Sequence, residues 1–387
     1  MSIQVTADGR EGDDSRIGSA GQANSGQANS GQPGLPFVFT GRGGEYFRIW
    51  IVNLALSILT LGIYSAWAKV RARRYFYANT LLDGAGFDYT AEPLKILKGR
   101  VIAALVIGAY VAAGQLYPVA SLPLVFVYWL LFPWLLMKSL AFNAHYSIHR
   151  GLRFGFDQGV GDAVRVYALL PILIPLTLGI YYPFWKRRVA GYYVGNHRYG
   201  GTPFSFHATG GQYLRLYLTA LPIILLCGAL AGAVLAGLGW LMESLFASLQ
   251  ADAGDDGEPG ARAVVLIQLM SFGMVALFYL CLLPVFAWLR ARGDNLRWNN
   301  TRLGEHCFAS DQSAVQLMLI YLLNVFAIVF TLGLAIPWAK VRLARYRAEH
   351  LRFVPGGPVD ELLAGQDGET SATADAFDDL GGFDAGL

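Results

Sequence analysis

The sequence is poor in charged residues and in cysteine. Asp, Glu, Lys and Arg make up 15% of its 387 residues, against about 25% in a typical soluble domain. The three cysteines show no Cys-x-x-Cys spacing, so we expect no disulfide framework, no metal site and no cofactor. The first residues also lack the cationic start and apolar core of a cleaved signal peptide. A soluble or disulfide-stapled protein is therefore not expected.

Catalytic sequence motifs are also absent. The chain has no GxSxG, HExxH, P-loop or dinucleotide-binding pattern. His145 and His149 are four residues apart, but two histidines without a third ligand are weak support for a metal. No nucleic-acid-binding motif accompanies the basic residues. We therefore expect a protein that is not an enzyme and binds no nucleic acid.

Apolar residues are what the sequence has in excess. Hydrophobic residues make up 55% of the chain, and the mean hydropathy is +0.41. Its long uncharged stretches provide seven apolar segments, of a length close to the roughly 20 residues that a spanning helix needs. The predicted fold class is an all-α integral membrane protein, a polytopic helix bundle with short strand-like elements at the cytoplasmic face.

An internal repeat organises the apolar part of the chain. The motif Thr-Leu-Gly begins at Thr60, Thr177 and Thr331 and is followed each time by a cluster of Lys and Arg. Each unit opens with Phe-x-aromatic or Phe alone, the period of a short half-buried strand, and continues as an apolar helix. The predicted repeat units lie near 37–89, 154–206 and 308–353.

Two tails flank this repeated domain. Residues 1–36 contain a tandem Gly-Gln-Ala-Asn-Ser, and residues 354–387 hold eight acidic and no basic residues. Neither composition can bury a core, so we expect both tails to be disordered. Residues 37–353 remain as the membrane domain.

The basic clusters are candidate lipid or anion contacts. A Lys or Arg close to an anionic leaflet contributes about 1 kcal/mol to membrane binding. Such clusters also act simply as determinants of topology, and this alternative stays open. The candidates are Lys69, Arg71, Arg74, Lys186, Arg188, Lys340, Arg342 and Arg345.

Polar residues inside the apolar segments are a second set of candidates. Broken helices can bind ions with backbone groups alone, and side chains at the break could line such a site. The alternative is that these residues cap or kink helices. The candidates are Asn53, Thr60, Thr177, Asn324 and Thr331.

The distribution of basic residues conflicts with seven full crossings. The connection 69–100 holds seven Lys and Arg, whereas 243–262 holds one, and nearly all connections resemble the first. Only two connections are poor in Lys and Arg, the turn near Tyr117 and 243–262. The positive-inside rule places every basic connection in the cytoplasm. That becomes possible if the repeated segments enter the membrane, break at Thr-Leu-Gly and return, so spanning and re-entry both stay open. The C-terminus is expected in the cytoplasm. The segments concerned are 46–68, 163–185 and 317–339.

Several motifs resemble one known family. Phe-Val-Phe-Thr-Gly at 37–41, Glu-Tyr-Phe-Arg at 45–48, Thr-Leu-Gly-Ile-Tyr at 60–64 and Trp-Ala-Lys-Val-Arg at 67–71 resemble the YjgN-like family of bacterial inner-membrane proteins. The resemblance covers about 37–353. It implies a multi-pass protein of the bacterial cytoplasmic membrane, and it carries over no catalytic or binding residue.

The functional expectation follows from these patterns. We expect a multi-pass inner-membrane protein without enzymatic activity that transports or conducts a small solute. The alternative is a membrane-organising or lipid-associated structural protein. In both cases the expected partner is the lipid bilayer, with anionic lipids at the basic clusters.

Overall fold

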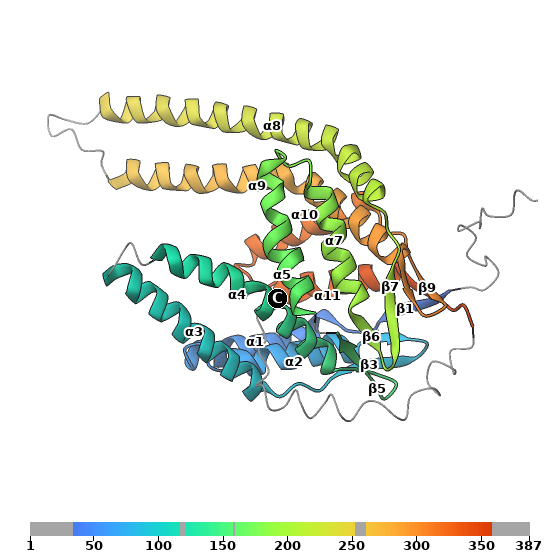
Figure 1. The fold of residues 1–387 in the computed structure, drawn as a ribbon. Helices are drawn as coiled ribbons and strands as arrows, with labels where there is room; N and C mark the ends of the chain where they lie inside the picture. Colours follow the sequence, from blue (N-terminus) through green and yellow to red (C-terminus); the bar gives the residue numbers. More distant parts are fainter. Residues whose placement is uncertain (1–33, 117–120, 158, 252–260, 358–387) are drawn as a thin grey trace, which may run out of the picture. The chain divides into compact units, whose positions relative to one another are not determined.

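The computed structural model describes residues 34–116, 121–157, 159–251 and 261–357. The two tails predicted to be disordered lie almost entirely outside these residues. In the described part, ten strands alternate with helices in a regular order (Figure 1). The strands are β1 (Leu35–Phe39), β2 (Thr80–Leu82), β3 (Ala85–Tyr89), β4 (Ser147–His149), β5 (Leu152–Phe156), β6 (His197–Tyr199), β7 (Thr202–Phe206), β8 (Thr301–Leu303), β9 (His306–Ser310) and β10 (Leu351–Val354).

The helices form hairpins, each inserted between two strands, and we number them 1 to 5 along the described chain. Hairpin 1 is α1 (Gly43–Leu59) with α2 (Ser65–Ala78), and hairpin 2 is α3 (Pro93–Leu116) with α4 (Ser121–His145). Hairpin 3 is α5 (Val160–Val164), η2 (Arg165–Leu169), η3 (Leu170–Ile172) and α6 (Leu173–Leu176), returning as α7 (Tyr182–Gly195). Hairpin 4 is α8 (Gly210–Ala251) with α9 (Ala261–Asn299), and hairpin 5 is α10 (Ala314–Phe330) with α11 (Ile336–Glu349).

The strands close into one antiparallel barrel. Their order around it is β1-β10-β9-β8-β7-β6-β5-β4-β3-β2, so strands that follow one another in the chain lie side by side. The exception is the closing pair, in which Leu35 of β1 faces Phe353 of β10 and Pro36 faces Arg352. The two strands at opposite ends of the described chain therefore seal the barrel.

The predicted all-α class is wrong because of this barrel. The sequence indicates short strand-like pieces, but each is only three to five residues long, and a single short strand has no stability of its own. Ten such strands become stable together because closure gives every strand two hydrogen-bonded neighbours. Long-range pairing of this kind leaves no local signal in the sequence.

All helical hairpins leave the same end of the barrel. At this end Phe39, the last residue of β1, pairs with Thr80, the first residue of β2, and hairpin 1 connects them. The corresponding pairs for hairpins 2 to 5 are Tyr89 with Ser147, Phe156 with His197, Phe206 with Thr301, and Ser310 with Leu351.

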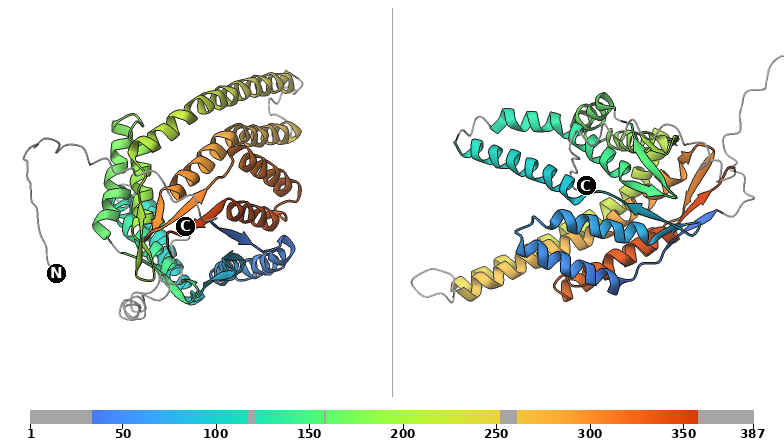
Figure 2. Two further views of the ribbon diagram at one scale, coloured as in Figure 1. Left: turned by 90° about the vertical axis from the view of Figure 1, so that its right-hand side faces the viewer. Right: turned by 90° about the horizontal axis from the view of Figure 1, so that it is seen from below.

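Tight turns occupy the opposite end of the barrel. Asp83 and Gly84 have φ of 49° and 72°, and Arg150 and Gly151 have φ of 48° and 81°. Two successive positive φ angles are the type I′ geometry that suits twisted hairpins. The barrel therefore has a helical end and a turn end, and Figure 2 shows the hairpins gathered on the helical side.

Hairpins 1, 3 and 5 reverse direction at the Thr-Leu-Gly motifs. Leu61 and Gly62 have φ of 49° and 91°, and the other two copies repeat these values closely. The backbone groups of this turn bond internally, as when Gly62 N donates to Ser57 O at 2.7 Å. Nevertheless the leucine is almost fully exposed, at 96% for Leu61, 92% for Leu178 and 94% for Leu332.

Hairpins 2 and 4 are longer and apolar. Within the described residues, four helical segments have the length and composition to cross a membrane. Their large side chains face outward, for example Leu105 at 68% exposure and Leu226 at 71%. The segments are Pro93–Gln115, Val125–His145, Gly210–Ser248 and Gln268–Asn299.

The densest packing lies where the hairpins join the barrel. Tyr89 and Ile96 are fully buried, and Phe142 is 1% exposed; all three belong to one cluster. A tyrosine also holds the base of hairpin 1 through hydrogen bonds. The Tyr75 hydroxyl accepts from Arg42 N at 2.8 Å and donates to Arg42 O at 2.8 Å, at the N-terminus of α1. The barrel and the hairpin bases thus pack together in several such clusters.

Candidate functional site

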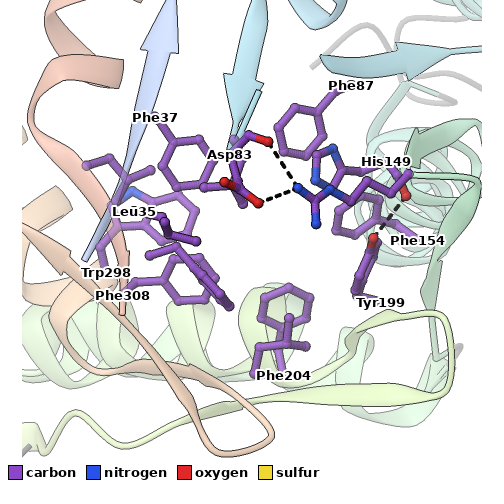
Figure 3. A pocket seen from close by; sticks show the side chains of 15 residues that line it. Leu35, Phe37, Asp83, Phe87, His149, Phe154, Tyr199, Phe204, Trp298 and Phe308 are labelled. Atoms are coloured by element: carbon purple, nitrogen blue, oxygen red, sulfur yellow. Dashed lines mark hydrogen bonds and ion pairs between the residues drawn. The ribbon is translucent and has the colours of Figure 1, made fainter. Parts of the chain in front are cut away.

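A ring of phenylalanines crosses the barrel interior. Each five-residue strand has Phe at its third position, and because side chains alternate along a strand, this residue points inward. Neighbouring rings stack, with centroids 6.3 Å apart for Phe37–Phe87, 6.4 Å for Phe87–Phe154 and 6.2 Å for Phe204–Phe308 (Figure 3). The phenylalanine ring consists of Phe37, Phe87, Phe154, Phe204 and Phe308.

On the turn side of the ring lies a small apolar cavity of about 180 Å³. Leu35, Leu303 and Phe353 belong to its wall. At its rim Arg150 NH2 and Asp83 Oδ2 form an ion pair at 2.5 Å, which is drawn in Figure 3. This cavity is therefore lined almost entirely by apolar surface, with the charged pair at its rim.

On the helical side of the ring lies a larger cavity of about 620 Å³, which we call the axial cavity. The second helix of every hairpin contributes to its wall. It shares four residues of the phenylalanine ring with the apolar cavity, so the ring separates two spaces along the barrel axis. Representative lining residues are Tyr77 of α2, Asn143 of α4, Tyr193 of α7, Arg297 of α9 and Arg347 of α11.

The charge in the axial cavity is mainly positive. Asp294 is 6% exposed and pairs with two arginines of its own helix, Arg290 Nε at 3.2 Å and Arg297 NH2 at 3.1 Å. Arg347 adds a third cation from α11. Three guanidinium groups thus face one carboxylate among the described lining residues.

The predicted basic residues differ in the contacts that they make. Arg74 Nε donates to Tyr89 O at 2.9 Å, and Arg345 NH2 donates to Gly41 O at 3.0 Å, so these two tie a returning helix to the loop that leads into a hairpin. Lys186 Nζ lies 5.3 Å from the centre of the Trp185 ring. The Lys69 side-chain nitrogen is buried.

The remaining basic candidates lie at the surface. Arg71, Arg188, Lys340 and Arg342 are exposed. Arg342 also donates from NH1 to Asn324 Oδ1 at 3.2 Å. None of these residues lines the apolar cavity or the axial cavity.

The predicted threonines are found at the hairpin turns. The Thr60 hydroxyl donates to Leu56 O at 2.8 Å and accepts from Tyr64 N at 2.9 Å. Thr177 and Thr331 make the same two contacts in their own hairpins. Each threonine therefore bridges the end of one helix to the start of the next.

The predicted asparagines pack inside hairpins 1 and 5. Asn53 is 6% and Asn324 is 8% exposed. Asn324 Nδ2 lies 3.4 Å from Ala339 O of the returning helix. Like the threonines, they do not belong to the lining of the axial cavity.

The sequence alone did not single out the charged side chains of α9 and α11 that line the axial cavity. Arg290, Asp294 and Arg297 follow a spacing of four and then three residues, which places them on one helix face. This spacing could have identified them, but their flanking position made them look like ordinary topology determinants. Phe87 and Phe204 were visible as part of the strand pattern, but their position with Phe37 in the wall of one cavity was not.

Burial shifts the pKa values of two residues that line the apolar cavity, Tyr199 and His149. The Tyr199 hydroxyl donates to His149 O at 2.9 Å, and burial raises the pKa of Tyr199 to about 12. Burial lowers the pKa of His149 below 6.5, and the nearby charge of Arg150 lowers it further, although the bond to Gly86 O opposes this. His149 is therefore neutral near pH 7.

We expect the barrel to lose stability as the pH falls below about 6.5. The unfolded chain takes up a proton at His149 near its ordinary pKa of about 6.5, whereas the folded chain resists protonation, so acid favours unfolding. In detergent, the melting temperature should fall between pH 7.5 and 5.5. In His149→Phe, which keeps an aromatic ring against Phe87, this fall should be smaller. An equal fall in both proteins would contradict the assignment.

Comparison with known proteins places the chain in a family. It matches the family described as bacterial proteins of unknown function (DUF898) over residues 34–380, and it belongs to that family. It is 27% identical over 368 residues to inner membrane protein YjgN of Salmonella typhimurium strain LT2, covering 84% of this chain and 89% of the relative.

Two further relatives are also called inner membrane protein YjgN. Those of Escherichia coli O157:H7 and K12 are 33% identical over 153 residues, which is 38% of this chain and 37% of theirs. No solved structure matches the chain. The resemblance deduced from the sequence is confirmed, and together with the apolar helices it identifies a membrane protein.

Proposed function

We propose that this member of the family conducts or transports a small solute along the axis of its barrel, with the phenylalanine ring as the gate. The supporting observation is the ring itself, which lies between a small apolar cavity and a wider cavity whose wall also contains charged side chains. Hydrophobic constrictions control passage by excluding water. A purely structural barrel core would not need a cavity of about 620 Å³ beside it.

The proposed membrane arrangement makes the protein multi-pass. Hairpins 2 and 4 cross the bilayer and return, whereas hairpins 1, 3 and 5 enter and turn at Thr-Leu-Gly. Since every hairpin begins and ends at the same end of the barrel, all its basic connections lie on one side. By the positive-inside rule that side would be cytoplasmic, and the barrel would lie there with its helical end toward the membrane.

Internal hydrogen bonding supports the re-entry of the short hairpins. Backbone away from regular helix is tolerated at membrane depth only if its polar groups are satisfied. At each turn the glycine N–H is bonded, to Ser57 O, Ile174 O and Ile328 O at 2.7, 2.8 and 2.7 Å. The exposed leucines beside these glycines suit a lipid environment.

The gate can be tested by removing part of the ring. In proteoliposomes, Phe87→Ala combined with Phe204→Ala should raise the passive flux of glycerol, chloride or potassium by about tenfold. A tenfold change corresponds to lowering the barrier by about 1.4 kcal/mol. Flux is followed by light scattering for glycerol and by enclosed dyes for the ions. The matched control is Phe126→Ala, which removes an outward-facing ring, 61% exposed, from α4.

The outcome decides the proposal. Increased flux in the ring variant, with Phe126→Ala unchanged, supports passage through the barrel. A ring variant that elutes as a folded, monodisperse protein but passes none of the three solutes faster than the parent would refute it.

Association with anionic lipid is the second candidate function. Arg71, Arg188 and Arg342 occupy equivalent positions in hairpins 1, 3 and 5, and all three are exposed. Their outward orientation is what a headgroup contact would require.

A further inference from the structure

We infer that a side pocket between α7, α8 and α9 binds an anionic phosphate group, either that of a lipid headgroup or free phosphate. The pocket has a volume of about 280 Å³. This inference concerns binding and does not depend on passage through the phenylalanine ring. Its polar lining residues are Tyr167 of η2, Lys186 and Tyr193 of α7, Tyr213 and Tyr217 of α8, and Arg290, Asp294 and Arg297 of α9.

The side pocket adjoins the axial cavity. Tyr193, Arg290, Asp294 and Arg297 belong to the walls of both. A group held by these arginines would therefore sit at the junction between the flank of the protein and its interior.

The arginines keep unused hydrogen-bonding capacity. Arg290 engages Asp294 Oδ2 through Nε at 3.2 Å, and Arg297 engages Asp294 Oδ1 through one terminal nitrogen at 3.1 Å. A guanidinium group has five N–H donors, so each arginine retains donors after this contact. With Lys186 the described lining carries three cations and one carboxylate, an excess of two positive charges that favours an anion.

A purely structural role explains these charges less well. Both ion pairs lie within α9, at spacings of four and three residues, so they do not fasten α9 to α7 or α8. Lys186 faces aromatic rings, with Nζ 5.6 Å from the centre of Tyr182 and 5.3 Å from that of Trp185. Cations turned toward a shared space, rather than paired across it, are the arrangement that binds an added anion.

The pocket also has room for a ligand. Gly293 belongs to its wall, and a methyl group there would meet only Leu216 Cδ2, at 3.9 Å. The absence of a side chain at Gly293 therefore leaves open space between the helices. A larger residue at this position should fill the pocket without altering its charge.

The position along α8 and α9 points to an amphiphile as one source of the anion. The pocket lies where these apolar helices approach the barrel, and beyond it the flank is apolar, with Leu225 64% and Phe286 57% exposed. A lipid headgroup could occupy the pocket while its chains follow this flank. A free phosphate would use the same cations without the apolar contacts.

Direct binding tests the inference on the full-length protein in detergent. The probes are inorganic phosphate, short-chain phosphatidylglycerol and short-chain phosphatidylcholine, and the readouts are calorimetric affinity and the rise in melting temperature. We expect phosphatidylglycerol or phosphate to bind and phosphatidylcholine not to bind. Binding of phosphatidylglycerol alone identifies a lipid source, and equal binding of phosphate identifies a free anion.

Two variants probe the pocket in different ways. Lys186→Gln with Arg290→Gln removes two cations but leaves Asp294 paired with Arg297 at 3.1 Å, and Gly293→Leu fills the space. Both should lower affinity at least tenfold. The matched control is Arg71→Gln with Arg188→Gln, which removes the same charge from exposed positions outside the pocket.

The inference is overturned if the parent protein binds neither anionic probe. It is also overturned if only the control variant loses binding, a result that would support lipid association at the exposed arginines. If both pocket variants are folded and bind normally, the anion lies elsewhere. Failure of the flux experiment would leave these binding results unaffected.

Discussion

Replacing Leu61, Leu178 and Leu332 together by Asp is expected to prevent stable insertion of the short hairpins. A charged residue at the centre of a bilayer costs about 3 kcal/mol, so three tips lying deep in lipid would together be strongly destabilised. The measurement is the yield of folded protein in the membrane fraction, followed by its melting temperature in nanodiscs. The control is the triple Leu→Ala variant, which shortens the side chains without adding charge.

The sign of this effect distinguishes lipid from water around the tips. Leu61 has φ of 49°, a left-handed conformation that is unfavourable for leucine and that Asp adopts more readily. If the tips were in water, Asp would relieve strain and the variant would be at least as stable as the parent. Stable insertion of the triple Asp variant would therefore rule out re-entry.

Replacing Tyr89 by Ala is expected to lower the free energy of unfolding by about 4 kcal/mol, the range for deleting a buried aromatic side chain. Tyr89 is fully buried where β3 meets the base of hairpin 2. Its ring lies 5.5 Å from that of Tyr77 and 5.2 Å from the Arg73 guanidinium. Deletion would leave a cavity and take a hydrogen-bonding partner from a partly buried cation.

The matched variant is Tyr89→Phe, which removes only the hydroxyl that accepts from Arg73 NH1 at 2.9 Å. We expect it to cost about 1–3 kcal/mol, because the bond involves a charged group. Unfolding of both variants is followed by denaturant titration in detergent. If Tyr89→Ala were as stable as Tyr89→Phe, packing around this ring would not be what stabilises the contact between β3 and the base of hairpin 2.

The sequence was informative about local features. The Thr-Leu-Gly motif indicated a break in each repeated segment, and the structure has a left-handed turn there, with Gly62, Gly179 and Gly333 at φ of 91°, 87° and 93°. The threonine hydroxyl and the glycine N–H bond only to residues within five positions of them in the chain, so the sequence pattern includes every residue that forms the turn.

The roles of the basic residues were less readable. Arg74 and Arg345 look in sequence like Arg71 and Arg342, and all four are exposed, but the first pair also donates to backbone carbonyls of neighbouring elements. The difference depends on which face of the returning helix meets the barrel loop. Spacing alone does not tell one face from the other until the neighbouring element is known.

Composition alone determined that this is a membrane protein, because a low charge content and long apolar stretches act through the solvent and need no partner elsewhere in the chain. Only the tertiary structure decided that strands of three to five residues close into a barrel, since each is held by its neighbours and β1 is completed by β10 from the far end of the described chain. The phenylalanine ring and the axial cavity are consequences of that closure, which gathers side chains that no local pattern connects.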